Sequence, residues 1–368
     1  MALKIFFCGD VVNSTANPDF IDPSLKYIIQ SCDIAIANFE APVKIENMHP
    51  IPKVGPHLYQ PKESIYYLKE AGFTMVSLAN NHIYDYGQLA LEKTIEELCM
   101  REIQFVGAGL TFEEAYTPKI IEKNGIKLGI IAACENEFGC LYEDQKRGGY
   151  AWLLNRNIED NIRKLKNEVD YLIVIAHAGV EDIPIPIKEW RDLYRRFCDI
   201  GVDVVIGHHP HVPQGYERYN NSLIFYSLGN FYFDTPSFRN SPDDSYSVII
   251  EFDQSRKIQY NIIYHKKINC KVLLVDEEKV SFNIEELNNL LMVDYEIRNN
   301  EICLELFHKY YYGYYKTAIR FSPITLIKKL LFIKRDSFYN HLFLLHNIKI
   351  DSHRFVVQRA LSLLTEAP

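Results

Sequence analysis

The sequence predicts an α/β protein with two sheets, and three observations support that prediction. Short apolar runs rich in Val and Ile alternate with helical segments through the first half of the chain. The pair Asn124 and Gly125 separates two strand-like runs and is the strongest short signal for a hairpin, so a mixed sheet is expected. Several strand-like runs then follow one another from residue 222, which predicts a second, antiparallel sheet packed on the first.

A β-α-β unit opens the chain, with strands at 4–8 and 33–37 and a helix at 23–32. Five prolines between residues 42 and 61 predict a loop. The next expected elements are helices at 62–71 and 88–101 and strands at 75–79 and 103–106. Four residues of the second of these helices are expected to face the sheet: Leu89, Leu91, Ile95 and Leu98.

The predicted hairpin has its strands at 119–122 and 126–132, and residues 135–152 form either a wall of the site or a simple loop. Further helices are expected at 158–168 and 188–200, and further strands at 171–176, 202–206, 222–227, 246–252, 258–264 and 272–275. Helical segments rich in Leu, Ile and Tyr follow. We therefore expect a main domain over 1–275 and a mainly helical C-terminal extension over 276–368.

The composition is that of a soluble globular protein, with 48% hydrophobic and 24% charged residues in 368. A formal charge of −8 argues against a nucleic-acid partner. No apolar run is long enough for a membrane-spanning helix, and the first apolar run is too short for a secretory signal. The eight cysteines lack CxxC spacing, which favours a reducing, cytoplasmic setting.

Residues 316–335 carry six basic and no acidic side chains. Within them, 325–335 places Leu326 with Leu330 and Ile327 with Leu331 on one helical stripe. One interpretation is a basic surface helix that makes a peripheral membrane contact or touches a polymeric substrate. The other, which we favour, is a helix packed on the main domain with its lysines in solvent.

Polar clusters follow the ends of five strand-like runs. The stretch 201–214, GVDVVIGHHPHVPQ, brings three histidines to a strand end, His208, His209 and His211. The other four clusters contain Asp10; Asn38 and Glu40; Asn81, His82 and Asp85; and His177 and Glu181. Open α/β sheets bind ligands beyond the carboxyl ends of their strands, so the clusters are expected to converge. Carboxylates, amides and imidazoles together suit two divalent cations.

At these motifs the chain resembles a known family. In order, GD, NFEAPV, LANNHIYDYG, HAGVE, GVDVVIGHHPHVPQ and YSLGNFYFD are similar to the bacterial CapA family of capsule or poly-γ-glutamate synthesis proteins, within the calcineurin-like metallophosphoesterase superfamily. The resemblance covers about residues 1–265. It implies a metallophosphoesterase-like sandwich of two sheets flanked by helices, αββα, and a centre of two divalent metal ions, Mn, Fe or Zn.

The resemblance also implies a metal ligand set. Asp10 and His211 would bind one ion and Glu40 would bridge the two. The remaining ligands would bind the second ion: Asn81, His177 and His209. Two positions depart from the family pattern. Val12 replaces a histidine of many relatives, so more water molecules would complete the coordination of one ion. Ala178 replaces a tryptophan of many relatives, which would enlarge the pocket near His177.

His82 corresponds to the residue that donates a proton to the leaving group or steadies the transferred phosphoryl, and Asp85 would hold its ring. Asn38, Glu181 and Asn230 are candidates for contacts with substrate or for support of the ligands; for the two asparagines, capping of turns is an equal alternative. His208 either joins this supporting group or faces the other way, into the core.

These observations favour a metal-dependent phosphoesterase that acts in capsule or exopolysaccharide biosynthesis, on a small anionic or phosphorylated saccharide. One alternative is hydrolysis of an amide or peptide bond in an anionic polymer such as poly-γ-glutamate. Another is a non-catalytic partner in capsule assembly that keeps the ligands for stability. The sequence leaves the oligomeric state open.

Overall fold

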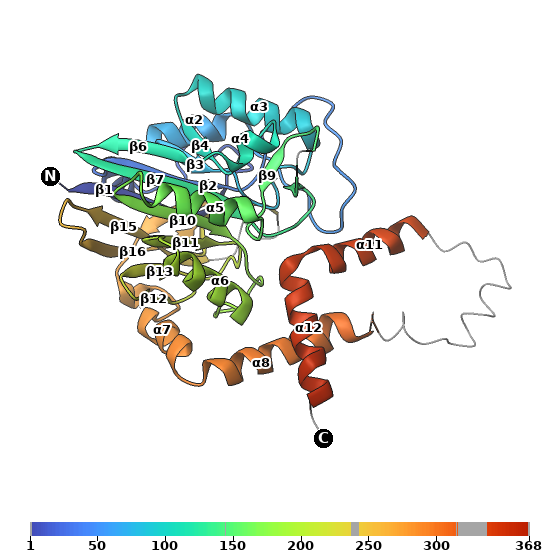
Figure 1. Ribbon diagram of the computed structural model, residues 1–368. Coiled ribbons are helices and arrows are strands. Elements are labelled where there is room, and N and C mark those ends of the chain that lie inside the picture. Colours follow the sequence, from blue (N-terminus) through green and yellow to red (C-terminus); the bar gives the residue numbers. More distant parts are fainter. Residues whose placement is uncertain (1, 144, 237–242, 314, 316–336, 367–368) are drawn as a thin grey trace, which may run out of the picture.

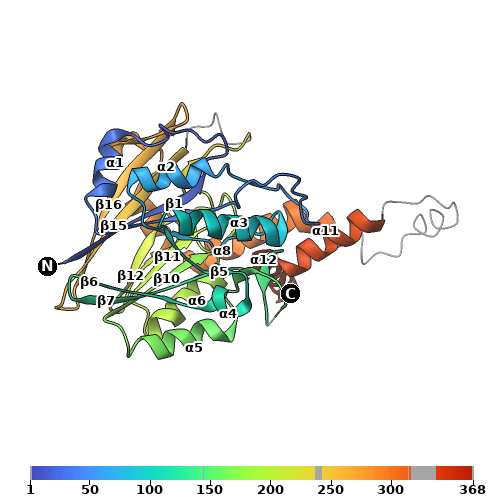
Figure 2. The same ribbon diagram turned by 90° about the horizontal axis from the view of Figure 1, so that it is seen from above.

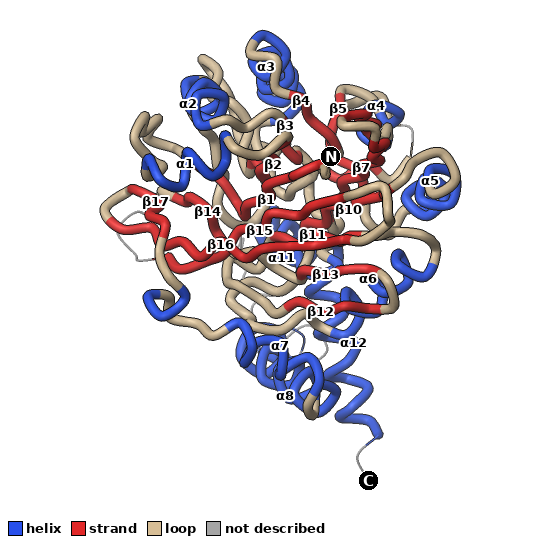
Figure 3. Tube along the Cα trace, turned by 90° about the vertical axis from the view of Figure 1, so that its left-hand side faces the viewer, coloured by secondary structure: helices blue, strands red, loops and turns tan. Residues whose placement is uncertain are grey.

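The computed structural model describes residues 2–143, 145–236, 243–313, 315 and 337–366. Two large sheets pack face to face, and helices cover the outer face of each (Figures 1 and 3). Helices α1, α2 and α3 lie on one side of this sandwich, and α5 and α6 lie on the other (Figure 3). The predicted α/β sandwich of two sheets flanked by helices is therefore confirmed.

The first sheet has the order β17-β16-β15-β1-β2-β3-β4, and β14 pairs with β1 beside this path. Strands β1 to β4 run parallel, whereas β15, β16 and β17 are antiparallel to their neighbours. The strands are β1 (Leu3–Val12), β2 (Ile34–Phe39), β3 (Met75–Ser77), β4 (Gln104–Val106), β14 (Asn230–Phe233), β15 (Asp243–Phe252), β16 (Ile258–Ile268) and β17 (Lys271–Leu274).

The second sheet has the order β12-β13-β11-β10-β7-β6, with a parallel centre and one antiparallel strand at each edge. Its strands are β6 (Lys119–Lys123), β7 (Ile126–Cys134), β10 (Tyr171–His177), β11 (Val204–His208), β12 (Tyr216–Tyr219) and β13 (Ser222–Phe225). A small third sheet contains β5 (Ala108–Gly109), β8 (Cys140–Leu141) and β9 (Gly149–Ala151).

The helices begin and end where local chemistry allows. Pro23 starts α1, where the Asp22 side chain accepts a hydrogen bond from the Ser24 amide, and Gly72 ends α2 with a φ of 105°. The helices are α1 (Pro23–Gln30), α2 (Glu63–Ala71), α3 (Gly87–Met100), α4 (Phe112–Tyr116), α5 (Arg156–Leu165), α6 (Lys188–Asp199), η1 (Glu277–Lys279), α7 (Ile284–Met292), α8 (Tyr295–Leu306), the π-helical turn η2 (Phe307–Tyr311), α11 (Ser337–Lys349) and α12 (Asp351–Glu366).

The hairpin predicted around Asn124 and Gly125 is confirmed. Strands β6 and β7 are antiparallel, with Lys123 opposite Ile126, and the two turn residues have φ values of 55° and 71°. Both values lie in the left-handed region that a two-residue hairpin turn requires and that Asn and Gly tolerate best.

Two details of the predicted fold are wrong. The late strands do not form a second sheet of their own, because β13 joins β11 in the second sheet while β15 to β17 extend the first sheet from β1. An apolar pattern identifies a strand but does not specify its neighbour. In α3, Leu89 is 67% exposed, whereas Leu91 and Leu98 are buried. Leu89 lies two residues before Leu91, about 200° around the helix, and so faces solvent.

Helices α8, α11 and α12 lie at one end of the sandwich (Figures 1 and 2). One apolar cluster joins Val356 and Ala360 of α12 to Trp190 and Tyr194 of α6. The predicted basic helix at 325–335 lies outside the described residues. Among the helices of the described ranges, none has the length and apolar character needed to cross a membrane.

Candidate metal centre

The carboxyl ends of parallel strands in both sheets meet at the candidate site. Asp10 lies in β1, Glu40 follows β2, and His82 belongs to the turns after β3. His177 ends β10, and His209 follows β11. The structure thus brings together side chains that are far apart in the sequence, as expected for ligands beyond strand ends.

Two glycines allow the strands that carry these residues to approach their neighbours. A Cβ atom on Gly9 would lie 1.8 Å from the carbonyl oxygen of Gly229, and a Cβ on Gly207 would lie 2.0 Å from that of Tyr226. The Asp10 amide donates a hydrogen bond of 3.1 Å to the Gly229 carbonyl. Only glycine fits such close backbone approach, so both motif glycines have a structural role next to a candidate ligand.

The loop after β11 turns sharply at two histidines. His209 has a φ of 97° and His211 a φ of 60°, which is uncommon for residues other than glycine. Such conformations cost on the order of 1–3 kcal/mol each and concentrate at functional sites. The alternation expected of an extended strand is broken here, and all three histidines of the motif reach the same site.

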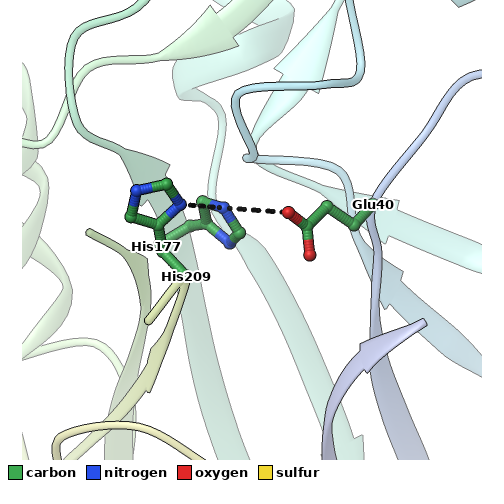
Figure 4. A group of neighbouring side chains, drawn as sticks. All are labelled: Glu40, His177 and His209. Carbon is green, nitrogen blue, oxygen red and sulfur yellow. Dashed lines mark hydrogen bonds and ion pairs between the residues drawn. The ribbon is translucent and has the colours of Figure 1, made fainter. Parts of the chain in front are cut away.

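The candidate ligands form two groups that share one carboxylate. Glu40, His177 and His209 make one group, and Asp10, Glu40 and His211 make the other, with the donor atoms of each group within 4.8 Å of one another. Glu40 Oε1 lies 3.6 Å from His177 Nε2 and 3.9 Å from His211 Nε2. Figure 4 shows Glu40 facing His177 and His209 from the opposite side of the site.

The environment of Glu40 fits a bound cation. Its side chain is fully buried, and neither carboxylate oxygen has a hydrogen-bond partner among the described residues. A buried polar group without a partner costs about 1–3 kcal/mol, and more when it is charged. A divalent ion on each side of Glu40 would satisfy both oxygens, and the mixed nitrogen and oxygen donors suit Mn, Fe or Zn.

Asparagines border both groups of candidate ligands. Asn81 Oδ1 lies 3.1 Å from His177 Nε2. Asn38 Nδ2 donates a hydrogen bond of 2.7 Å to Asp10 Oδ1 and lies 3.1 Å from His177 Nδ1, and Asn230 Oδ1 lies 3.0 Å from His211 Nδ1. Asn38 and Asn230 therefore touch candidate ligands, instead of only capping turns.

His208 does not face away from the site. Its Nδ1 atom lies 3.3 Å from Asp10 Oδ1. Of the two predicted orientations, the one in which His208 faces away from the site is therefore wrong. Glu181 is exposed at the rim. Desolvation raises the pKa of Glu181, but the nearby imidazoles, His211 first, lower it below its usual value overall.

Electrostatics divide the ligands into charged and neutral groups. Burial raises the pKa of Asp10, but the imidazoles of His208 and His211 hold it well below its usual value. Burial lowers the pKa of His211, but Glu40 and Asp10 together raise it well above its usual value. Burial and then Asp10 raise the pKa of Glu40. Burial lowers the pKa of His177 and brings that of His209 to about 4. His177 and His209 are thus neutral near pH 7, the form that binds metals.

His82 is held beside the ligands by Asp85. His82 Nδ1 lies 2.7 Å from Asp85 Oδ2, which also accepts a hydrogen bond of 2.7 Å from the Leu58 amide. Lys53, from the proline-rich loop, pairs with Asp85 and lies 3.3 Å from His82 Nδ1. Burial and then the charge of Lys53 lower the pKa of His82, although Asp85 opposes this shift.

Sequence analysis missed three buried charged residues at the site, Lys53, Glu135 and Glu137. Glu135 Oε1 lies 3.6 Å from His209 Nε2, and burial raises the pKa of Glu137 to about 7. Both glutamates follow β7, so the rule that located the other clusters would have found them if β7 had been expected to run parallel to β10. Lys53 lies in a loop without a local signal.

The sequence matches a known protein family. The sequence model described as "Bacterial capsule synthesis protein PGA_cap" matches residues 4–235. The PGA biosynthesis protein CapA of Bacillus subtilis (strain 168) is 32% identical over 251 residues, which cover 63% of each chain. The capsule biosynthesis protein CapA of Bacillus anthracis is 31% identical over 222 residues, 59% of this chain and 54% of its own length. The chain therefore spans less than two thirds of these relatives.

Among solved structures, a hypothetical protein from Thermus thermophilus aligns with a TM-score of 0.46 at 18% identity, over 72% of this chain and 100% of its own. A 5'-nucleotidase precursor from the same organism aligns with a TM-score of 0.44 at 13% identity, over 81% of this chain and 59% of its own.

Proposed function

The chain belongs to the bacterial capsule synthesis protein PGA_cap family, as its motifs predicted, and on this basis we propose that it is a metal-dependent phosphoesterase in capsule or exopolysaccharide biosynthesis. One observation carries the proposal: the buried carboxylate of Glu40, which has no hydrogen-bond partner in the described part of the chain, is shared by two groups of metal-ligating side chains. Two divalent ions held by these groups would suit attack on a phosphate ester.

The residues that would hold the ions follow from the two groups. Asp10, Glu40 and His211 would hold one, and Glu40, His177 and His209 would hold the other, with Asn81 beside them. When bound, the ions supply Lewis acidity at the phosphoryl group and make water a stronger nucleophile near neutral pH.

His82 is the proton donor of this proposal. Asp85 would accept a hydrogen bond from the Nδ1–H group of His82, which fixes the ring orientation, and the imidazolium form of His82 would carry a second proton on Nε2 for the leaving oxygen. Lys53 keeps Asp85 ionised and in place, and its charge makes His82 a stronger acid. The exposed carboxylate of Glu181 would contact the substrate at the rim of the site.

The substrate class rests on the family and on the names of its members. We propose a small anionic or phosphorylated saccharide, because cations at the centre would attract negative charge that the acidic chain otherwise repels. Hydrolysis of an amide bond in an anionic polymer is a second candidate, favoured by the B. subtilis relative named for PGA biosynthesis. Metal-activated water attacks carbonyl groups as well as phosphates.

The test compares the wild type with His209→Ala and His82→Ala. Metal content would be measured after supply of Mn²⁺, together with turnover of bis-p-nitrophenyl phosphate, p-nitrophenyl phosphate and poly-γ-glutamate. We expect about two ions in the wild type, phosphatase activity in the wild type alone, loss of metal in His209→Ala and retention of metal in His82→Ala.

Other outcomes contradict the proposal in distinct ways. Cleavage of poly-γ-glutamate without turnover of either phosphate would favour the amide hydrolase. A wild type that binds metal but cleaves none of the three would favour a non-catalytic assembly partner. Full turnover in His82→Ala would remove His82 as the proton donor while leaving the metal centre in place.

A further inference from the structure

A buried carboxylate connects the metal centre to helix α12. Glu135 follows β7 and is fully buried. Its Oε1 atom accepts hydrogen bonds of 3.0 Å from the Gly179 amide and 2.8 Å from the Ser352 hydroxyl, and its Oε2 atom accepts one of 2.7 Å from the Ser352 amide. Ser352 is the second residue of α12, 217 positions away in the sequence.

The same carboxylate faces the outer edge of the His209 ring. Glu135 Oε1 lies 3.6 Å from His209 Nε2, while His209 Nδ1 lies 3.1 Å from His177 Nε2 on the opposite edge. One ring nitrogen of His209 thus faces the other candidate ligands and the second faces a carboxylate. In metal sites a carboxylate that accepts a hydrogen bond from the outer ring nitrogen fixes the tautomer and orientation of the histidine and makes it a better ligand, and Glu135 lies on the side of the ring from which such a bond is made.

The first turn of α12 is itself held firmly. The Ser352 hydroxyl accepts a hydrogen bond of 2.8 Å from the Trp190 indole of α6 while it donates to Glu135. Next to it, Asp351 accepts hydrogen bonds from the Asn136 amide at 2.9 Å and from the Trp152 indole at 2.8 Å. The free amides and the dipole of a helix N-terminus also favour a carboxylate at this position. Glu135 therefore has little freedom to move.

We propose that Glu135 and Ser352 act as a positioning pair, through which the first turn of α12 orients His209 for metal binding. The C-terminal helices are then part of the metal centre, although the family match ends at residue 235. This inference rests on the proposed function only in taking His209 as a metal ligand. It does not depend on which bond is hydrolysed.

The experiment measures Mn²⁺ affinity of the full-length protein by calorimetry in the absence of substrate. Glu135→Gln keeps the shape of the side chain but places an amide nitrogen against groups that donate to the Glu135 oxygens, so we expect the dissociation constant to rise about 10- to 100-fold. Ser352→Ala removes one of two hydrogen bonds from Ser352 and is expected to raise it about tenfold. Ser352→Thr keeps the hydroxyl and is expected to stay near the wild type.

A double-mutant cycle tests whether Ser352 acts through Glu135. In the Glu135→Gln background, Ser352→Ala should change the affinity by less than about twofold, because the shared path is already broken. The matched control is Arg359→Gln, which removes the contact of α12 with Glu189 of α6 but touches neither Glu135 nor Ser352. We expect it to leave the affinity unchanged even if it lowers the melting temperature.

Several results would overturn the proposal. Unchanged metal affinity in Glu135→Gln, or equal losses from Ser352→Ala in both backgrounds, would show that the pair does not act on His209. An equal loss in Arg359→Gln would reduce the effect to general loosening of α12. A wild type that binds Mn²⁺ without any hydrolysis contradicts the proposed function and leaves this inference standing.

Discussion

Replacing Glu40 with glutamine is expected to have opposite effects on stability with and without metal. In the metal-free protein Glu40 is buried and has no hydrogen-bond partner among the residues that the structure describes. Its pKa is raised, because burial and Asp10 disfavour its charged form. The unfolded chain ionises this carboxyl at its ordinary value of 4.5. Glutamine carries no charge, so Glu40→Gln is expected to stabilise the metal-free fold near pH 7.

The pH dependence gives the magnitude. A carboxyl with a raised pKa in the folded state contributes stability below its unfolded pKa of 4.5, and this contribution is lost as the pH rises. Protonating a carboxyl of ordinary pKa at pH 7, 2.5 units above 4.5, costs about 3.5 kcal/mol at about 1.4 kcal/mol per unit, and this is the upper limit of the effect at Glu40. The advantage of Glu40→Gln is expected to grow from near zero at pH 4.5 as the pH rises, without exceeding this limit at pH 7.

Metal reverses the order. A ligand present at 100 times its dissociation constant stabilises the native state by about 2.7 kcal/mol per site. The wild type should gain this amount from Mn²⁺, whereas Glu40→Gln should lose most of it, because Glu40 belongs to both groups of ligands. Urea denaturation with EDTA and with Mn²⁺, at pH 5 and pH 7, measures the four free energies of unfolding of each protein.

The control is Glu217→Gln, the same chemical change at a half-buried carboxylate that has hydrogen-bond partners. Glu217 accepts hydrogen bonds from Arg191, Arg195 and Tyr226, so its replacement should cost about 3 kcal/mol with or without metal. The reasoning would be refuted if Glu40→Gln kept the full metal-dependent gain. A loss of stability in EDTA as large as that of Glu217→Gln would refute it equally.

Three further predictions follow from single contacts. Lys53→Met removes a positive charge 3.3 Å from His82, so the pKa of His82 should rise. The basic limb of the pH profile of kcat/KM should then move up by about one pH unit. An unmoved limb would contradict His82 as the acid. Burial raises the pKa of Glu217, but hydrogen bonds from Arg195 and Arg191 lower it from 4.5 to about 2. The contribution of Glu217 to folding stability is therefore present above pH 4.5, and about 3 kcal/mol should be lost as the pH falls toward 2. Glu217→Gln should lack this acid dependence. Gly9→Ala would place a methyl group against the Gly229 carbonyl and should destabilise the fold by about 3 kcal/mol in thermal denaturation, and an unchanged melting temperature would contradict the close approach.

The sequence predicted the candidate site better than the pairing of strands. Asp10, Glu40, His177 and the histidine loop could be located because polar residues directly follow apolar runs, and parallel strands bring such positions to one edge. Glu135 was not predicted as a site residue because its strand was taken only as one arm of a hairpin, although β7 also pairs in parallel with β10. A local pattern specifies a strand, whereas its partners depend on the whole sheet.

Residues held by long-range contacts had no local signal. Lys53 lies among prolines and looks like a solvated loop lysine, yet its amine is buried against Asp85. Ser352 has no motif around it, and its role depends on a carboxylate 217 residues earlier. His208 and His209 reach the same site, instead of opposite faces, because the positive φ of His209 breaks the alternation of a strand. Backbone conformations of this kind are set by tertiary contacts.

The C-terminal helices illustrate why the division at residue 275 stays a prediction. The family match stops at 235, but Trp190 of α6 packs edge-to-face against Phe355 of α12 and donates its indole hydrogen to Ser352. Helix α6 leads directly into β11, whose end carries the histidines of the metal centre. Helix α12 therefore covers the same helix that leads to the strand carrying these ligands. Loss of α12 is expected to disturb the positions of the metal ligands before it unfolds the two sheets.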